Sequence, residues 1–182
     1  GNLITDATTQ FETFETDDGD DVNAIKRFGS VCFLGLNNHV FLFAITPLAS
    51  RPFAVRELSV GKHRGPVSHS AVVEANQRLF WLSQTDIMSM GLYGEVKAHA
   101  THARPLIAGL SDSRREFAVA GYDSVNDLVM FGVSDGSDTQ HKTIIALNPT
   151  NDAVYPWTIQ ANAMAQRLVS GDNRLLLGGY AG

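Results

Sequence analysis

Four short hydrophobic segments recur along the chain at nearly equal distances, and this repeat constrains the fold more than any other feature. Each follows a polar or glycine-containing turn, and together they are Val31–Leu34, Leu79–Leu82, Leu128–Phe131 and Leu175–Gly178. Their first residues, at positions 31, 79, 128 and 175, are 48, 49 and 47 positions apart. A repeat of this length indicates a chain built from copies of one supersecondary unit.

A second apolar stretch precedes each of these segments. The four preceding stretches are Asn23–Phe28, Ser70–Ala75, Phe117–Tyr122 and Arg167–Ser170. The turns between the paired stretches are rich in Gly, Asn and Asp, which tolerate the left-handed backbone that tight hairpins require. The sequence therefore predicts four β-hairpins, each with runs of strand length.

The first three units continue beyond the hairpin with further apolar segments. Third strands are predicted at 38–43, 86–90 and 142–147, and fourth strands at 53–58, 103–107 and 153–158. Four strands within about 40–50 residues are typical of one propeller blade. We therefore predict an all-β fold, a β-propeller of four-stranded antiparallel blades, with about three and a half blades present in this chain.

The predicted blades divide the chain as follows. The first covers residues 22–60, the second 66–110 and the third 114–160, and residues 164–182 form the first half of a fourth. Residues 1–21 form a lead-in segment that could close a preceding blade. A sandwich or jelly roll has no reason to repeat every 48 residues, and a solenoid repeats at a shorter period. Because half a blade buries too little surface alone, we expect a piece of a longer chain, the alternative being a ring completed by other subunits.

Composition narrows the classes of function. Of 182 residues, 44% are hydrophobic and 18% are charged, which favours a folded protein over a disordered one. The formal net charge of −5 disfavours sequence-specific nucleic-acid binding, which requires a basic surface. Apolar stretches such as Val40–Ile45 are too short to span a bilayer, so no membrane association is expected. The single cysteine, Cys32, excludes an intrachain disulfide.

An ordered series of motifs runs from residue 16 to residue 182. It consists of an Asp/Gly-rich lead-in (16–25), a strand of apolar and basic residues (52–59), the segment 65–74, an aromatic strand (78–83), a Tyr-Asp turn (121–128) and a Tyr-Pro-Trp ending (155–158). In this order the motifs resemble the β-propeller structural proteins of tailed bacteriophages, in the class of tail hub, nozzle and stabilisation proteins. The segment 98–104 departs from the short run into the fourth strand that this family usually shows.

The resemblance implies a structural role. It implies a component of the phage virion tail, a rigid protein-interaction platform in a homo-oligomeric ring around the DNA exit channel, with other virion proteins as partners. It implies no catalytic residues and no cofactor, so we expect a protein that is not an enzyme. The alternative is a secreted propeller enzyme or lectin acting on polysaccharide. A cellular platform of the WD or kelch kind ranks last, because the sequence lacks a convincing WD or kelch motif.

Four aspartates near the start of the first blade are candidate metal ligands. Asp17, Asp18, Asp20 and Asp21 surround Gly19, and several carboxylate oxygens on a loop suit Ca²⁺. The segment lacks the spacing and the bidentate Glu of an EF-hand loop. The competing interpretation, which we favour, is a solvated turn that leads into the first strand.

Four histidines form a second candidate metal set. His99 and His102, with His63 and His69 upstream, could hold zinc through their imidazole nitrogens. A spacing of three residues suits a helical turn, which the β-rich pattern does not predict. Surface or interface histidines are the favoured interpretation.

Other side chains suggest chemistry only weakly. Ser68, His69 and Asp123 can be drawn as a nucleophilic triad, but no Gly-x-Ser-x-Gly elbow supports it. Aromatic side chains could form a stacking platform for sugars, although packing between blades is favoured for them; they are Phe80, Trp81, Tyr155 and Trp157. Pro156 lies within a predicted fourth strand, and its missing N–H is tolerated if that strand is an outer edge.

Overall fold

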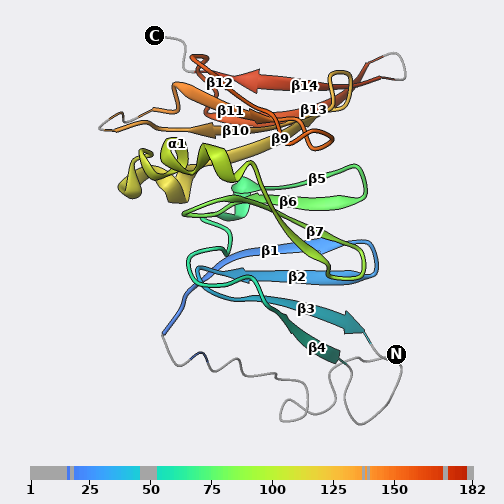
Figure 1. The fold of residues 1–182 in the computed structure, drawn as a ribbon. Coiled ribbons are helices and arrows are strands. Elements are labelled where there is room, and N and C mark those ends of the chain that lie inside the picture. The colour runs from blue at the N-terminus through green and yellow to red at the C-terminus, as the bar shows by residue number, and fades with distance from the viewer. Residues whose placement is uncertain are drawn as a thin grey trace.

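The computed structural model describes residues 16, 19–45, 53–136, 138, 140–169 and 172–179. These residues form four antiparallel sheets that are stacked one on the next, from the N-terminal sheet at the bottom of the view to the C-terminal sheet at the top (Figure 1). Most of the lead-in segment expected at residues 1–21 lies outside the described residues.

Each of the first three sheets contains four strands in chain order. The first sheet holds β1 (Val22–Phe28), β2 (Val31–Leu36), β3 (Val40–Ile45) and β4 (Phe53–Leu58). The second holds β5 (Val72–Ala75), β6 (Arg78–Leu82), β7 (Ile87–Gly91) and β8 (Val96–His99). The third holds β9 (Val119–Asp123), β10 (Leu128–Val133), β11 (Thr143–Leu147) and β12 (Val154–Trp157). The last sheet pairs β13 (Ala163–Val169) with β14 (Asp172–Gly178).

Tight turns set the register of the hairpins. Asn76 and Gln77 join β5 to β6 with φ of 49° and 58°, so both central residues are left-handed, as a type I′ hairpin turn requires. Gly29 opens the β1–β2 turn with φ of 57°, and Asp127 closes the β9–β10 turn with φ of 52°. The Gly, Asn and Asp residues of the sequence repeat therefore lie where the backbone needs them.

A hydrophobic core fills each space between successive sheets. Phe80 and Trp81 are adjacent on β6 and point to opposite faces, because side chains alternate along a strand. Trp81 belongs to the core shared with the first sheet, and Phe80 to the core shared with the third. Met164 and Leu175 of the last sheet pack against the third sheet. The second and third sheets are therefore packed between two neighbours, as the blades of a propeller are, and the first sheet is packed against the second.

Successive first strands also contact one another: β1 with β5, β5 with β9, and β9 with β13. Strands are thus ordered from an inner β1, β5, β9 or β13 to an outer β4, β8 or β12. Pro156 lies on β12, the outer strand of its sheet, where a missing N–H breaks no ladder on the free side. The predicted fold, four-stranded antiparallel blades with about three and a half in this chain, is confirmed.

The structure corrects the predicted position of the fourth strand in the second blade. The sequence pattern predicts this strand at 103–107, but the strand is β8, at Val96–His99. Residues 101–117 instead form short helical turns: η3 (Thr101–Ala103), α1 (Arg104–Ala108) and η4 (Asp112–Phe117). Ala100 turns the chain with φ of 49°, and Pro105 lies in the first turn of α1, where its missing N–H costs nothing. This insertion lies beside the boundary between the second and third sheets (Figure 1).

One further short helical turn, η2 (His69–Ala71), leads into β5. Within the described residues, no helix is long and apolar enough to cross a membrane.

Candidate functional site

The acidic lead-in segment contributes to the first sheet. Asp20 accepts backbone hydrogen bonds from Asn37 (3.1 Å) and Asn38 (2.6 Å), so its carboxylate closes the turn between β2 and β3. Asp21 is exposed, and Asp17 and Asp18 lie outside the described residues. Among the residues that the structure describes, no three His, Cys, Asp or Glu side chains gather as a metal site would require. Of the candidate calcium ligands that the structure describes, Asp20 therefore has a structural role in the β2–β3 turn.

The four candidate zinc ligands lie on different elements. His63 lies in the β4–η2 loop, His69 in η2, His102 in η3, and His99 ends β8. His99 is buried, whereas His63, His69 and His102 are exposed. The structure gives His99 other partners, described below.

The suggested triad of Ser68, His69 and Asp123 does not form. Ser68 caps η2 by accepting a hydrogen bond from the Ala71 N–H (3.1 Å), and its hydroxyl donates to the Ala118 carbonyl oxygen (2.8 Å). Asp123 accepts hydrogen bonds from Val125 and Asn126 in its own turn. Both side chains stabilise local turns.

A different serine, histidine and aspartate lie in line between the second and third blades. Ser89 is on β7, His99 on β8, and Asp152 in the β11–β12 turn of the next blade. Ser89 Oγ is 2.7 Å from His99 Nε2, and His99 Nδ1 is 2.5 Å from Asp152 Oδ1. Because a carboxylate only accepts, Nδ1 carries the proton and Nε2 accepts from the serine hydroxyl. We refer to these three residues as the Ser89–His99–Asp152 chain.

Two cations flank this chain. Arg78 donates from Nε to Ser89 Oγ at 3.0 Å and pairs with Glu95. Lys97 lies 2.9 Å from the Asp152 carboxylate. The carboxylate thus receives hydrogen bonds from both His99 and Lys97. The ring of Phe80, 5.3 Å from the imidazole centroid, forms the apolar side of the site.

Burial and charge shift the proton affinities in this site. Burial lowers the pKa of His99, outweighing the hydrogen bond and the attraction of Asp152 that favour its charged form. For Asp152, burial alone would raise the pKa, but the hydrogen bonds from His99 and Lys97 outweigh it and leave that pKa below its usual value. The geometry therefore favours a neutral imidazole beside an ionised carboxylate.

The hydrogen bonds run from serine to histidine to aspartate as in a catalytic triad, but the serine lies in surroundings unlike those of an accessible nucleophile. Ser89 is 0% exposed and His99 is 2% exposed, so the hydroxyl lies inside the packed core. Ser89 Oγ also accepts the Arg78 hydrogen bond, which lowers its electron density as a nucleophile. In this arrangement, the Ser89–His99–Asp152 chain connects the second blade to the third. The sequence offers His99 as a candidate metal ligand but gives no signal for Ser89 and Asp152, because no local motif links three residues spread over 64 positions.

A buried carboxylate forms a second polar connection. The Asp86 side chain is fully buried and accepts from Arg64 Nε at 3.0 Å and from Arg104 Nε at 2.6 Å. Arg64 comes from the loop before η2, and Arg104 begins α1, so Asp86 fixes both to the second blade. The hydrogen bond to Asp86 raises the pKa of Arg104, which stays charged.

His141 provides a third connection, between the third blade and η4. Its Nε2–H donates to the Phe117 carbonyl oxygen at 2.7 Å, and its Nδ1 accepts from the Ser134 hydroxyl at 2.9 Å. Burial lowers the pKa of His141, which favours the neutral ring that this pair of bonds requires. At the hairpin tips, Tyr122 and Asp127 also bond to Asn76 of the second blade.

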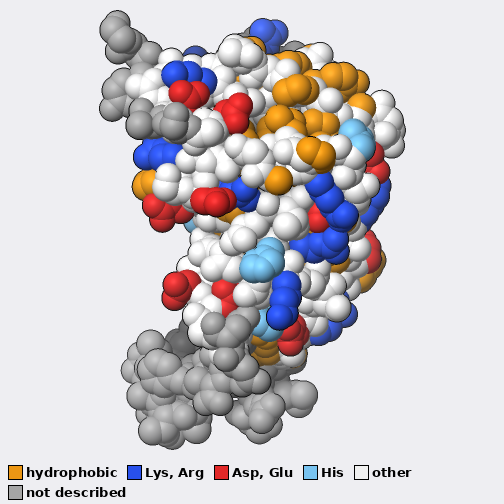
Figure 2. Space-filling view, turned by 60° about the vertical axis from the view of Figure 1, so that its left-hand side comes forward, with side chains coloured by type: hydrophobic (Ala, Val, Ile, Leu, Met, Phe, Trp, Pro, Cys, Tyr) orange, Lys and Arg blue, Asp and Glu red, His pale blue; other side chains and the backbone are white. Residues whose placement is uncertain are grey.

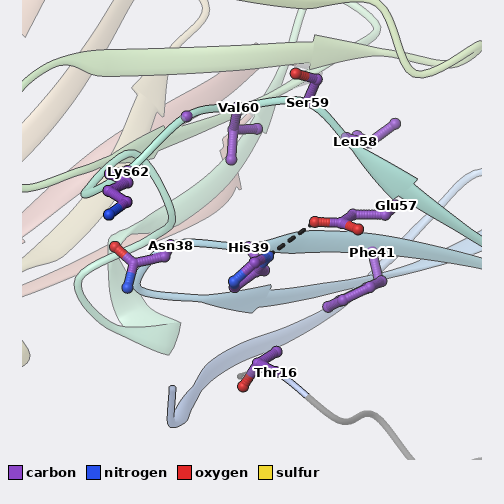
Figure 3. A pocket seen from close by; sticks show the side chains of 10 residues that line it. Thr16, Asn38, His39, Phe41, Glu57, Leu58, Ser59, Val60 and Lys62 are labelled. Carbon is purple, nitrogen blue, oxygen red and sulfur yellow. Dashed lines mark hydrogen bonds and ion pairs between the residues drawn. The ribbon is translucent and has the colours of Figure 1, made fainter. Parts of the chain in front are cut away.

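An open pocket of about 610 Å³ lies on the first blade. Figure 3 shows its lining side chains, which come from the lead-in, from the β2–β3 turn and β3, and from the end of β4 and the loop after it; they are Thr16, Asn38, His39, Phe41, Glu57, Leu58, Ser59, Val60 and Lys62. His39 Nδ1 lies 2.8 Å from Glu57 Oε1, and the His39 and Phe41 rings are nearly parallel, 6.2 Å apart. The pocket thus offers one aromatic platform beside several polar groups.

The C-terminal end of the stack exposes apolar surface. On the face seen in Figure 2, hydrophobic side chains concentrate toward the upper, C-terminal sheets. On β14, Leu176 is 47% exposed and Leu177 is 38% exposed. Tyr155 of β12 and Ile159 are also exposed, and Trp157 is half-buried against the third sheet. Of the four aromatics considered for sugar stacking, Phe80 and Trp81 are enclosed in the cores.

The sequence matches no protein-family model and no curated protein. Among solved structures, the chain is similar to the WD40 domain of Pan2 from Neurospora crassa, with a TM-score of 0.49 and 9% sequence identity. The similarity covers 81% of this chain and 41% of that one, so this chain spans less than half of the Pan2 domain.

Proposed function

We propose that this chain is part of a rigid β-propeller platform in the tail of a bacteriophage, where it contacts copies of itself and other virion proteins. The observation that carries the proposal is the stack of propeller blades, whose sheets bury apolar cores against one another. The order of motifs between residues 16 and 182, which resembles that of phage tail propellers, directs the proposal to a virion.

The edge of β14 is where further protein, from the same chain or from another copy, continues the stack. Each complete blade adds a third strand to its second: β3 to β2, β7 to β6 and β11 to β10. Within the described residues, β14 has no such neighbour and exposes Leu176 and Leu177. An apolar edge strand pairs readily with another strand, because its N–H and C=O groups are unpaired on one side. Protein that supplies this strand would cover the leucines and continue the stack.

The polar connections within and between blades support the platform role. The Ser89–His99–Asp152 chain, the Asp86 pair of arginines and the His141 bonds all tie one element to another. Buried, fully paired polar groups specify one arrangement of the parts that they join. A stack fixed in this way suits a ring whose parts keep one arrangement.

The test combines detection in particles with a measurement of assembly. We expect antibodies against this chain to detect it in purified phage particles, and mass photometry of the purified full-length protein to show a ring of several copies. Leu176→Asp places a charge on the exposed edge and should prevent ring formation. Tyr93→Asp is the matched control, because Tyr93 is 88% exposed in the β7–β8 turn and should assemble normally. A monomeric protein that is absent from particles would contradict the proposal.

The pocket on the first blade favours a second candidate function, binding of a polysaccharide. Sugars pack a flat face on an aromatic ring and direct their hydroxyls to polar groups. Phe41 supplies the ring here, and the pocket is also lined by the Glu57 carboxylate, the Asn38 amide and the Lys62 ammonium group. If this function holds, a glycan array probed with the full-length protein should show binding that Glu57→Gln weakens and Glu74→Gln, an exposed change on β5, leaves intact. An array with no bound glycan would exclude it.

A further inference from the structure

The Ser89–His99–Asp152 chain joins parts of two blades at one imidazole. Ser89 and His99 belong to the second blade, and Asp152 belongs to the 148–152 turn of the third. Lys97 and His99 of the second blade both reach Asp152 in this turn. Of these two side chains, the His99 imidazole is the more deeply buried. The protonation state of the His99 imidazole therefore affects how the 148–152 turn is held against the second blade.

We propose that the Ser89–His99–Asp152 chain is an acid-sensitive clamp, in which neutral His99 holds the 148–152 turn against the second blade and protonated His99 releases it.

The hydrogen-bond chain accommodates only the neutral ring. In that state the Ser89 hydroxyl donates to Nε2 while its oxygen accepts from Arg78 Nε. A proton on Nε2 would turn both neighbours of Ser89 Oγ into donors and leave the buried serine hydrogen without an acceptor. An unsatisfied buried donor is costly, so the protonated ring is expected to leave this position.

The charged groups around the His99 imidazole act in opposite directions on its protonation. Arg78 on β6 and Lys97 on β8 oppose a third positive charge, and Glu95 compensates Arg78 alone. Asp152 in the turn attracts the imidazolium, while Ser89 on β7 and Phe80 on β6 bring no charge. Burial is the strongest influence and lowers the pKa of His99, so the neutral form prevails in the folded state.

The direction of the pH effect follows from this balance. Above the ordinary histidine pKa of about 6.5, His99 is neutral in folded and unfolded chains, and the clamp is fully effective. As the pH falls below that value, the open or unfolded chain takes up a proton that the closed clamp resists, so the closed state loses stability. Asp152 acts in the same direction at lower pH, because its folded pKa is also lowered.

Local hydrogen exchange of the full-length protein tests the clamp. After correction for intrinsic rates, the peptides that cover 96–99 and 148–152 should exchange several-fold faster at pH 5 than at pH 7, because the open state takes up a proton that the closed clamp resists. His99→Gln cannot be protonated and should show no such rise. His102→Gln removes an exposed histidine three residues away and should behave as the wild type. An equal rise in His99→Gln, or no rise in the wild type, would overturn the proposal.

A second variant and a second measurement keep the test decisive if His99→Gln does not fold. Asp152→Asn suits the backbone, because Asp152 has φ of 59° and Asn tolerates that region. We expect its 148–152 peptide to exchange rapidly at both pH values. Histidine ring exchange followed by mass spectrometry gives the pKa of each histidine in the wild type. A His99 pKa at or above the ordinary histidine value of about 6.5 would mean that acid does not weaken the contact, contrary to the clamp.

Discussion

Replacement of Trp81 by alanine is expected to lower the free energy of unfolding by about 3–5 kcal/mol, the usual cost of truncating a buried large aromatic. Trp81 is 0% exposed and packs between the first and second blades, with its ring centroid 5.3 Å from that of Phe33. Its Nε1–H donates to the Arg64 carbonyl oxygen at 2.8 Å, so the substitution leaves a cavity and an unpaired carbonyl. Urea unfolding followed by circular dichroism measures the change.

Tyr93→Ala is the control for this substitution. Tyr93 is an aromatic residue of the same blade whose side chain is almost entirely in solvent, so its loss should change the unfolding free energy by less than about 0.5 kcal/mol. If Trp81→Ala cost no more than Tyr93→Ala, the second sheet would not be packed against the first, and the stacked arrangement would be wrong.

Replacement of Gly65 by alanine is expected to cost about 3 kcal/mol or more, at the upper end of the range for overpacking. A Cβ at this position would lie 1.5 Å from the Leu36 carbonyl oxygen and 2.9 Å from that of Asn37. The clash is with backbone, and Gly65 N–H donates to the Asn37 carbonyl oxygen at 2.8 Å, so the loop cannot withdraw without losing that bond. Thermal or urea unfolding provides the measurement.

Gly109→Ala is the matched control for Gly65→Ala. The nearest atoms to a Cβ at Gly109 are backbone oxygens at 3.5 and 3.6 Å, an ordinary contact distance, and its φ of −76° is helical. Alanine there should be neutral or slightly stabilising, because it restricts the unfolded chain. Equal losses for the two variants would mean that the loop before η2 does not approach the β2–β3 turn as described.

The blades were predictable because their signals are local and repeated. Hairpin turns need Asn, Gly or Asp at left-handed positions, and Asn76, Gly29 and Asp127 meet that need at intervals close to the blade period. The helical insertion was missed because short helical turns have too few residues to show a helical period. Pro105 was the available signal, since proline favours the first turn of a helix.

The polar connections were less predictable than the fold. Ser89, His99 and Asp152 come together only because β7 and β8 are neighbours and the next blade stacks with its 148–152 turn above them. Nothing in the sequence near Asp152 distinguishes it from the aspartates of other turns. Asp86 was likewise read as the start of a strand, and its two arginines lie 22 and 18 residues away. Long-range pairing of this kind depends on the stack.

The polar chains and the cores together account for a stiff stack with an incomplete last blade. Its inner strands contact their successors, each gap is filled with apolar side chains, and buried hydrogen bonds fix the turns. In the proposed function, blades held together in this way would keep their arrangement within a larger assembly.

A cryo-electron microscopy structure of the full-length protein in its assembled state tests the central claim most directly. We predict a ring of radial blades in which the outer edge of β14 pairs with a third, antiparallel strand and Leu176 is buried. A particle in which the four hairpins share one continuous sheet, or in which β14 stays exposed to solvent, would contradict this account.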